Sequence, residues 1–263
     1  MAITKTICFA NNKGGSGKST TCANVGYALS TLGKKVLLID GDMQMNLTLS
    51  FFDDERSLEF AKSDLNLYRG ITEQKDLSDF IQHTDYKGLD LIPSSTLMSS
   101  IEFDLFTKWQ REFILKKGLE RIKATGKYDY ILIDAPPTLG CWVMNIMCAS
   151  DHLVIPVEAS PWGLFGIANM FEFYEQIRQV APTLNLLGIA VTKASERKNY
   201  FKQTIDTLSS LENVRLFSSI IRVDSMVEWS QDVSKPVMAY KKSSRAAQEY
   251  MELAKEIETY VNR

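Results

Sequence analysis

The stretch "TICFANNKGGSGKST", residues 6–20, decides the fold of this chain. An apolar run ends at Ala10, a loop with three glycines follows, and a segment with helical spacing begins near Ser19. This order is typical of a phosphate-binding loop, because glycines let backbone N–H groups turn inward and the helix presents its positive end. We expect Lys18 to bridge the β and γ phosphates of a nucleotide and the Ser19 hydroxyl to ligate Mg²⁺.

A second lysine, Lys13, stands five residues before Lys18. One lysine is enough to hold a triphosphate, so Lys13 needs another explanation, and a solvated loop lysine is the simple alternative. The segment predicted to contact the nucleotide comprises Asn12, Lys13, Gly14, Gly15, Ser16, Gly17, Lys18, Ser19 and Thr20.

Carboxylates for a magnesium site follow two other apolar runs. "YILIDAPP" (130–137) places Asp134 after an expected strand, where it would hold Mg²⁺ through water. "VLLIDGD" (36–42) ends with Asp40 and Asp42, which point the same way because alternate strand residues share a face. We assign Asp40 to the metal and Asp42 to polarising the attacking water, with a helix cap or a solvated loop acid as the alternative for Asp42.

Apolar runs alternate with segments of helical spacing along the whole chain. This alternation predicts one α/β domain with a mostly parallel, twisted sheet of about seven or eight strands and helices on both faces. Short surface helices are expected in 51–88, and a C-terminal helix packed on the sheet is expected from 243 onward. The expected strands are 5–10, 35–40, 89–93, 128–134, 152–157, 184–192 and 215–221, and the expected helices include 19–32, 107–123, 164–179 and 199–211.

Composition excludes several classes of protein. The net charge of −2 rules out a nucleic-acid polycation, so any DNA contact needs a local basic patch. No apolar run approaches the roughly 20 residues of a membrane span, and the chain starts with its first expected strand rather than a signal peptide. The cysteines lack CxxC spacing and are expected as free thiols in a reducing cytoplasm: Cys8, Cys22, Cys141 and Cys148.

The motifs together resemble the ParA/MinD group of P-loop ATPases over nearly the whole chain. "KGGSGKST" matches the deviant Walker A pattern KGGxGK[ST] of this group. "VLLIDGDMQMNLT" resembles its second motif, with Asp42, Gln44 and Asn46 in place and Met43 where proline is common. "YILIDAPPTLG" resembles its third motif, "MNIMCASDHLVIPVEASPWGLFGI" follows its later helix-strand-helix pattern, and "SKPVMAYKKSSRAAQEYMELAKEI" resembles the tail of partition ATPases.

The resemblance implies a role for Lys13. In the family the signature lysine reaches across a dimer to the phosphates of the partner's nucleotide, so ATP joins two subunits and hydrolysis weakens the dimer. It further implies a single P-loop ATPase domain over 1–263 without an N-terminal helix-turn-helix extension, ATP and Mg²⁺ as cofactors, slow turnover and a ParB-like centromere-binding activator. The implied location is cytoplasmic and associated with the nucleoid.

Adenine recognition in the family lies near the ends of the later strands. Here those ends are "VTKAS" (191–195) and "IIRVDS" (220–225). The resemblance therefore implies Lys193, Ile221 and Arg222 as candidate adenine contacts. Many partition relatives have Ile-Pro-Arg-Asn at the second position, and this chain lacks the proline.

Two branches of the family fit poorly. A membrane-binding relative ends in a basic amphipathic helix, whereas "YMELAKEIETYVNR" alternates acids and bases. A nitrogenase-reductase relative takes two cluster cysteines from each subunit, and no cysteine lies between Cys22 and Cys141.

DNA partition is the branch that remains, with non-specific DNA bound through phosphate contacts. A second family arginine is missing near Ser225 or Met226. The alternative is a nucleotide-dependent scaffold that positions a partner protein with weak or no DNA binding, and each cation could also be an ordinary surface charge. The candidate DNA contacts are Arg197, Lys198, Lys202, Arg222, Lys241, Lys242 and Arg245.

Overall fold

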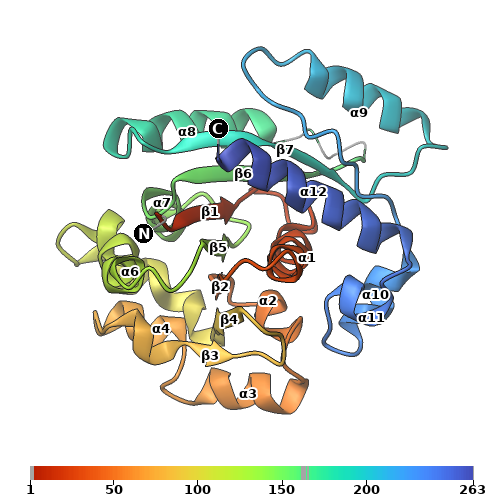
Figure 1. Ribbon diagram of the computed structural model, residues 1–263. Helices are drawn as coiled ribbons and strands as arrows, with labels where there is room; N and C mark the ends of the chain where they lie inside the picture. Colours follow the sequence, from red (N-terminus) through yellow and green to blue (C-terminus); the bar gives the residue numbers. More distant parts are fainter. Residues whose placement is uncertain (1–2, 161–163, 165, 263) are drawn as a thin grey trace.

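The computed structural model describes residues 3–160, 164 and 166–262. In these residues the core is a seven-stranded sheet in the order β3-β4-β2-β5-β1-β6-β7 (Figure 1). Neighbouring strands are parallel, except that β3 pairs antiparallel with β4. The strands are β1 (Lys5–Phe9), β2 (Val36–Asp40), β3 (Gln82–His83), β4 (Leu89–Ile92), β5 (Tyr130–Asp134), β6 (His152–Glu158) and β7 (Asn185–Thr192).

Helices cover both faces of this sheet, which confirms the predicted fold class. Figure 1 shows α1 (Lys18–Thr31) and α12 (Arg245–Val261) packed together on one face. The other face is covered by α4 (Leu67–Thr72), α5 (Ile101–Phe106), α6 (Ile114–Ala124), α7 (Cys141–Cys148) and α8 (Ile167–Val180). The remaining helices are α2 (Asn46–Leu49), α3 (Asp54–Lys62), α9 (Asn199–Ser209), α10 (Ser225–Gln231) and α11 (Val237–Tyr240), with short 3-10 turns η1 (Leu77–Phe80), η2 (Thr96–Ser100) and η3 (Arg111–Phe113).

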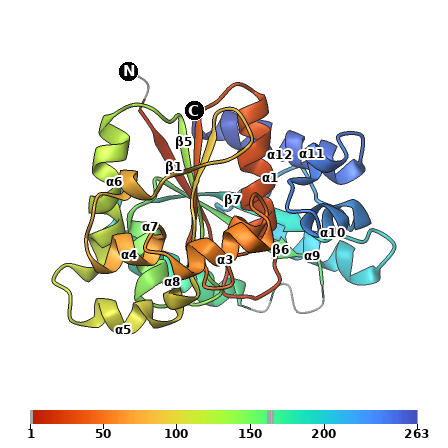
Figure 2. The ribbon, with the colours of Figure 1, turned by 90° about the horizontal axis from the view of Figure 1, so that it is seen from below.

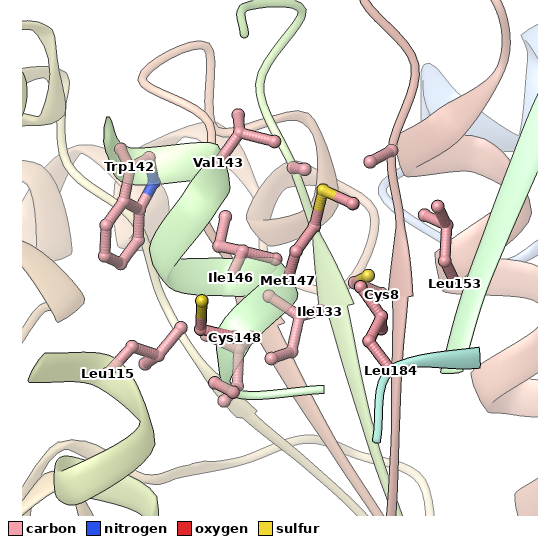
Figure 3. Packing of buried hydrophobic residues seen from close by; sticks show 14 of the residues in the cluster. Cys8, Leu115, Ile133, Trp142, Val143, Ile146, Met147, Cys148, Leu153 and Leu184 are labelled. Carbon is pink, nitrogen blue, oxygen red and sulfur yellow. The ribbon is translucent and has the colours of Figure 1, made fainter. Parts of the chain in front are cut away.

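Two apolar layers hold the helices to the sheet because alternate strand residues point to opposite faces. In β5, Ile131 and Ile133 pack toward α7, whereas Leu132 packs toward α1 and α12. Figure 3 shows the first layer, in which Ile146 and Met147 of α7 lie against the strand side chains. Burial on both faces explains why the strands read as continuous apolar runs.

The end of the sheet differs from the prediction. Residues 215–221 do not form a regular strand. They meet β7 through an isolated bridge between Leu216 and Ile189 and through a hydrogen bond from the Ile221 N–H to the Val191 carbonyl at 2.9 Å. The backbone N–H of Ser218 donates instead to Glu256 of α12 at 2.9 Å, so this segment divides its hydrogen bonds between the sheet and the helix. The sheet nevertheless has seven strands, because β3 forms an additional edge strand that was not predicted. It lies in the region 51–88, where only surface helices were expected.

Most helix predictions are close to the observed elements. The expected helix 107–123 begins later, at Ile114, after the turn η3. The expected helix 164–179 corresponds to α8, although Phe165 lies outside the described residues. The predicted C-terminal helix is α12, capped by the Ser244 hydroxyl and buried along Tyr250, Leu253 and Ile257.

The four cysteines are free thiols, as expected, and only Cys141 is partly exposed. Within the part of the chain that the structure describes, no helix is both long enough and apolar enough to cross a membrane.

Candidate functional site

A cavity of about 990 Å³ opens at the carboxyl edge of the sheet, where β1 leads into α1. Its lining includes Gly14, Gly15, Ser16, Gly17, Lys18, Ser19 and Thr20, which are the loop residues predicted to hold a nucleotide. Asn12 and Lys13 belong to the same loop but not to the lining. The parallel strands place their carboxyl ends at one edge, so side chains far apart in sequence meet here.

The shape of the loop depends on two glycines in left-handed backbone conformation, Gly15 at φ 75° and Gly17 at φ 84°. Gly17 has little space for a side chain, since an added Cβ would lie 3.3 Å from the Thr192 hydroxyl. That hydroxyl, at the end of β7, donates a hydrogen bond to the Ser16 carbonyl at 2.8 Å. The sheet therefore fixes the loop from behind and leaves its N–H groups toward the cavity.

Lys18 lies beneath the loop, and only 5% of its surface is exposed. Its ammonium group donates to the Lys13 carbonyl at 3.2 Å. Burial lowers the pKa of Lys18, while the charges of Asp134 and Asp42 act in the opposite direction. A lysine held among carboxylates in this way presents a fixed cation to a phosphate group in the cavity.

Asp134 ends β5 and is fully buried. Neither of its carboxylate oxygens has a hydrogen-bond partner within the described residues. Burial, with the neighbouring charge of Asp40, raises the pKa of Asp134 well above its usual range, against the opposing effects of the Ser19 hydroxyl and Lys18. Buried, unpartnered carboxylate oxygens beside a hydroxyl group are a donor set that suits Mg²⁺.

Asp40 is also fully buried, but its oxygens are occupied. One accepts from the Asp42 N–H at 3.1 Å, and the other accepts from the Thr48 N–H at 2.8 Å and the Thr48 hydroxyl at 2.6 Å. Burial raises the pKa of Asp40 to about 7 despite these hydrogen bonds. Asp40 thus shapes the loop after β2, while the Asp134 oxygens, which have no hydrogen-bond partner within the described residues, remain near enough to the Ser19 hydroxyl for it to affect their pKa.

Asp42 lines the cavity together with Gln44 and Asn46. Its backbone carbonyl accepts from the Ser94 hydroxyl at 2.7 Å, and one carboxylate oxygen accepts from the Gln44 N–H at 3.0 Å. These bonds fix the position of the carboxylate at the wall of the cavity. It lies where it could accept a hydrogen bond from a water molecule.

Lys13 points away from this cavity. Its ammonium group donates to Glu158 at 2.7 Å and to the Ser160 hydroxyl at 3.0 Å, at the end of β6. Partial burial would raise the pKa of Glu158, but the hydrogen bond and charge of Lys13, with Lys193, outweigh it and lower the pKa. The two lysines therefore have separate positions, one inside the phosphate loop and one at its outer rim.

Of the three predicted adenine contacts, one lies in the cavity and two do not. Lys193 lines the cavity, whereas Ile221 is buried in the apolar layer beside α12. Arg222 is held by Glu196 and Glu249, each at 2.6 Å. Lining residues that the sequence did not suggest include Gln231, Asp232, Val233 and Ser234 at and after the end of α10, and Asp53, Asp54 and Glu55 at the start of α3. Neither segment has a sequence pattern that indicates a ligand; Gln231 is identified by its hydrogen bond to the Thr20 hydroxyl at 3.0 Å.

The candidate DNA contacts come from α9, α12, the turns before these two helices and, for Arg222, the segment before α10. Arg197, Lys198, Lys202, Lys241 and Lys242 are exposed. Arg222 and Arg245 are brought together, but both contact Glu249, and Arg245 also donates to the Val223 carbonyl at 2.6 Å. Within the described residues, the first five cations make no ion pair, whereas carboxylates neutralise the two arginines.

Comparisons with known proteins agree with the geometry. A family model described as an AAA domain matches residues 4–186. The chain is 33% identical over 254 residues to the sporulation initiation inhibitor protein Soj of Bacillus subtilis, covering 96% of this chain and 98% of that protein. It is 30% identical over 254 residues to the chromosome partitioning protein ParA of Caulobacter vibrioides, covering 96% and 93%.

The fold is also similar to that of a solved structure. Cobyrinic acid a,c-diamide synthase from Mycobacterium smegmatis, crystallised with ADP and magnesium, superposes with a TM-score of 0.84 at 24% identity, covering 99% of this chain and 96% of that one. P-loop ATPases of the matched family hydrolyse nucleotide and use ATP and Mg²⁺, as the sequence predicted. The chain therefore belongs to the ParA/Soj family of partition ATPases.

Proposed function

We propose that this protein is a DNA partition ATPase that dimerises on binding ATP, binds DNA without sequence preference and leaves DNA after hydrolysis. Its cargo would be a plasmid, a chromosome or a mobile element. A ParB-like centromere-binding protein would stimulate the slow ATPase, and the protein would act in the cytoplasm on the nucleoid.

The position of Lys13 is the observation that supports this proposal. Lys18 already supplies the cation inside the loop, and Lys13 lies at the rim with its ammonium group on Glu158. Since Lys13 does not line its own cavity, it could bind the phosphates of a nucleotide in a second subunit once it leaves Glu158. Two subunits facing each other would then be joined by two nucleotides.

The residues of this chain have distinct tasks in such a site. The N–H groups of the loop and the Lys18 ammonium would bind the phosphates, and Ser19 with Asp134 would hold Mg²⁺. The bound Mg²⁺ would neutralise phosphate charge in a cavity that Asp42, Asp53, Asp54, Glu55 and Asp232 make acidic. Asp42 would orient and polarise a water molecule toward the γ phosphate.

Losing the γ phosphate removes the group to which Lys13 of the other subunit binds. The dimer would therefore weaken after hydrolysis, and Lys13 could return to Glu158. DNA affinity would follow the dimer, because two subunits present twice as many phosphate contacts as one. Nucleotide state would thus control residence on DNA.

The Lys13→Gln variant tests the proposal. It removes the cation at the rim and leaves Lys18, the glycines and Ser19 to bind ATP. We expect sedimentation with ATP and Mg²⁺ to give dimers for the parent and monomers for the variant, while nucleotide affinity stays within a few-fold of the parent. Lys87→Gln is the matched control, since Lys87 is an exposed lysine at the opposite edge of the sheet, before β4.

DNA binding is measured on the same proteins with ATP and with ADP over a range of salt concentrations. The parent should bind DNA with ATP, and affinity should fall steeply as salt rises. An ATP-dependent dimer of the Lys13→Gln protein would contradict the proposed action of Lys13 across the dimer.

A nucleotide-dependent scaffold with weak DNA binding is the second candidate. The neutralisation of Arg222 and Arg245 by Glu196 and Glu249 favours it. An ATP-dependent dimer that does not bind DNA at low salt would support this function over partition.

A further inference from the structure

We propose that an exposed aromatic surface, formed by Phe103, Phe106 and Trp109, is buried against a second copy of this chain when the ATP dimer forms. This inference rests on the proposed function, because it names the surface through which that dimer closes. The three side chains are 83%, 71% and 88% exposed. Among the large apolar side chains of the described residues, only Ile3 reaches comparable exposure.

The surface stands on a firmly held support. Ile101 and Leu105 of α5 are buried in the apolar layer. On another side of the helix, Asp104 accepts from the Tyr68 hydroxyl at 2.8 Å and the Ser100 hydroxyl at 2.9 Å. Phe103 and Phe106 thus lie on a fixed helix and Trp109 lies in the turn that follows it. Exposed apolar surface on a rigid element is typical of an interaction site.

The location of α5 favours a second copy as the occupant. The helix follows the carboxyl end of β4, so it lies at the same edge of the sheet as the phosphate loop after β1. Figure 2 shows α5 at the lower edge of the molecule. Two subunits that face each other across their nucleotides would bring this edge of each toward the other.

The area that a stable dimer must bury also favours a second copy as the occupant. A standard interface buries roughly 800 Å² on each partner, and the residues around the phosphate loop that would meet are largely polar. Three aromatic side chains with this exposure supply roughly 360–600 Å² per subunit, at about 150–250 Å² for a whole side chain. The aromatic surface would provide the apolar part of an interface that the cavity rim lacks.

Hydrogen bonds connect the aromatic surface to the nucleotide cavity. Glu102 of α5 accepts from the N–H groups of Cys141 at 2.8 Å and Trp142 at 3.1 Å, and so caps α7. The Trp142 indole donates to the Gly41 carbonyl at 2.9 Å, next to Asp42. The loop that follows Asp134 ends at this cap. A contact at α5 and a nucleotide in the cavity would therefore both affect the position of this loop.

Site-specific labelling tests the location directly. Phe103→Cys is treated with maleimide alone, with ADP and with a non-hydrolysable ATP analogue, and labelling at position 103 is read by peptide mass spectrometry. We expect labelling to slow at least about tenfold with the ATP analogue and to stay unchanged with ADP. Ile3→Cys is the control, since residue 3 precedes β1 at the opposite edge of the sheet.

Dimerisation tests the contribution of the surface. The triple variant Phe103→Ser, Phe106→Ser and Trp109→Ser is compared with Ile3→Ser and Val180→Ser combined, which removes exposed apolar groups elsewhere. We expect a dimer dissociation constant at least about 30-fold higher for the triple variant and an unchanged constant for the control. An unchanged melting temperature and unchanged ADP affinity would show that both variants fold.

The outcomes separate this inference from the proposed function. If the parent forms no dimer with ATP, the proposed function fails and this inference with it. If parent and triple variant dimerise equally, or position 103 stays reactive in the dimer, only this inference is overturned. Protection of position 103 by vesicles of anionic phospholipid without nucleotide would also overturn it, since a membrane surface would then be the occupant.

Discussion

Replacing Glu158 with Gln should strengthen ATP-dependent dimerisation. In the single subunit the Lys13 ammonium is held by Glu158 at 2.7 Å and by the Ser160 hydroxyl at 3.0 Å. In the proposed dimer, Lys13 would have to leave these partners before it could reach the phosphates of another subunit. The ion pair would therefore oppose that dimer, and removal of the Glu158 charge should favour it.

The size of the effect follows from the exposure of the pair. The side chains of Lys13 and Glu158 are 26% and 27% exposed. A hydrogen bond to a charged group contributes about 1.5–3 kcal/mol and a fully exposed ion pair about 0–1 kcal/mol, so we assign about 1 kcal/mol to this partly exposed pair. A dimer requires release of two such pairs, which amounts to about 2 kcal/mol, or about 30-fold in the dimer dissociation constant.

Sedimentation over a range of protein concentrations, with a non-hydrolysable ATP analogue, measures this constant. Ser160→Ala should give a smaller gain, because it removes one neutral partner only. Adding Glu158→Gln to Lys13→Gln should give no gain, since the lysine to be released is absent. A Glu158→Gln dimer no tighter than the parental one, within threefold, would refute the reasoning.

Three further changes have expected outcomes. Lys18→Ala should weaken ATP binding about 100-fold or more, because the phosphates lose their fixed cation, and calorimetric titration with ATP measures the loss. Asp42→Ala should still bind ATP and accumulate as a dimer while steady-state hydrolysis falls about 10²–10⁴-fold, so turnover at the parental rate would give Asp42 another role. Burial raises the pKa of Asp40 to about 7, above an unfolded value of about 3.9, so the folded protein binds more protons than the unfolded chain between these values. The free energy of unfolding of the nucleotide-free protein should therefore fall from pH 4 to pH 7, and thermal melts should show a weaker pH dependence for Asp40→Asn.

The sequence predicted those elements in which the local residue pattern matches the burial and backbone conformation that the residues have in the fold. The buried parallel strands appear as apolar runs, and the phosphate loop requires glycine at Gly15 and Gly17 for its backbone conformation. Residues 215–221 had the composition of a strand, yet Glu256 of a distant helix takes the Ser218 N–H. Competition of this kind depends on three-dimensional contacts and leaves no periodic pattern.

In the candidate site, too, residues placed by local sequence could be predicted, and residues placed by distant contacts could not. Lys18, Ser19 and Asp134 could be assigned because each lies at a fixed spacing from a glycine or a strand. The positions of Gln231 and Glu102 could not, since one depends on how α10 folds back over α1 and the other on how α5 meets α7. The ion pair of Lys13 with Glu158 joins residues 145 positions apart, and only the pairing of β1 with β6 brings them together.

The charges near α12 explain why DNA binding would depend on the dimer. Arg222 and Arg245 are matched by Glu196 and Glu249, so this group of four has no net charge to offer a DNA phosphate. Among the candidate DNA contacts, the exposed cations that make no ion pair within the described residues are Arg197, Lys198, Lys202, Lys241 and Lys242. Each phosphate contact contributes about 0.9 to the salt slope, so one subunit with a few such contacts binds weakly at physiological salt. A dimer doubles their number on one particle, and the nucleotide that holds the two subunits together would thereby also determine how long the protein stays on DNA.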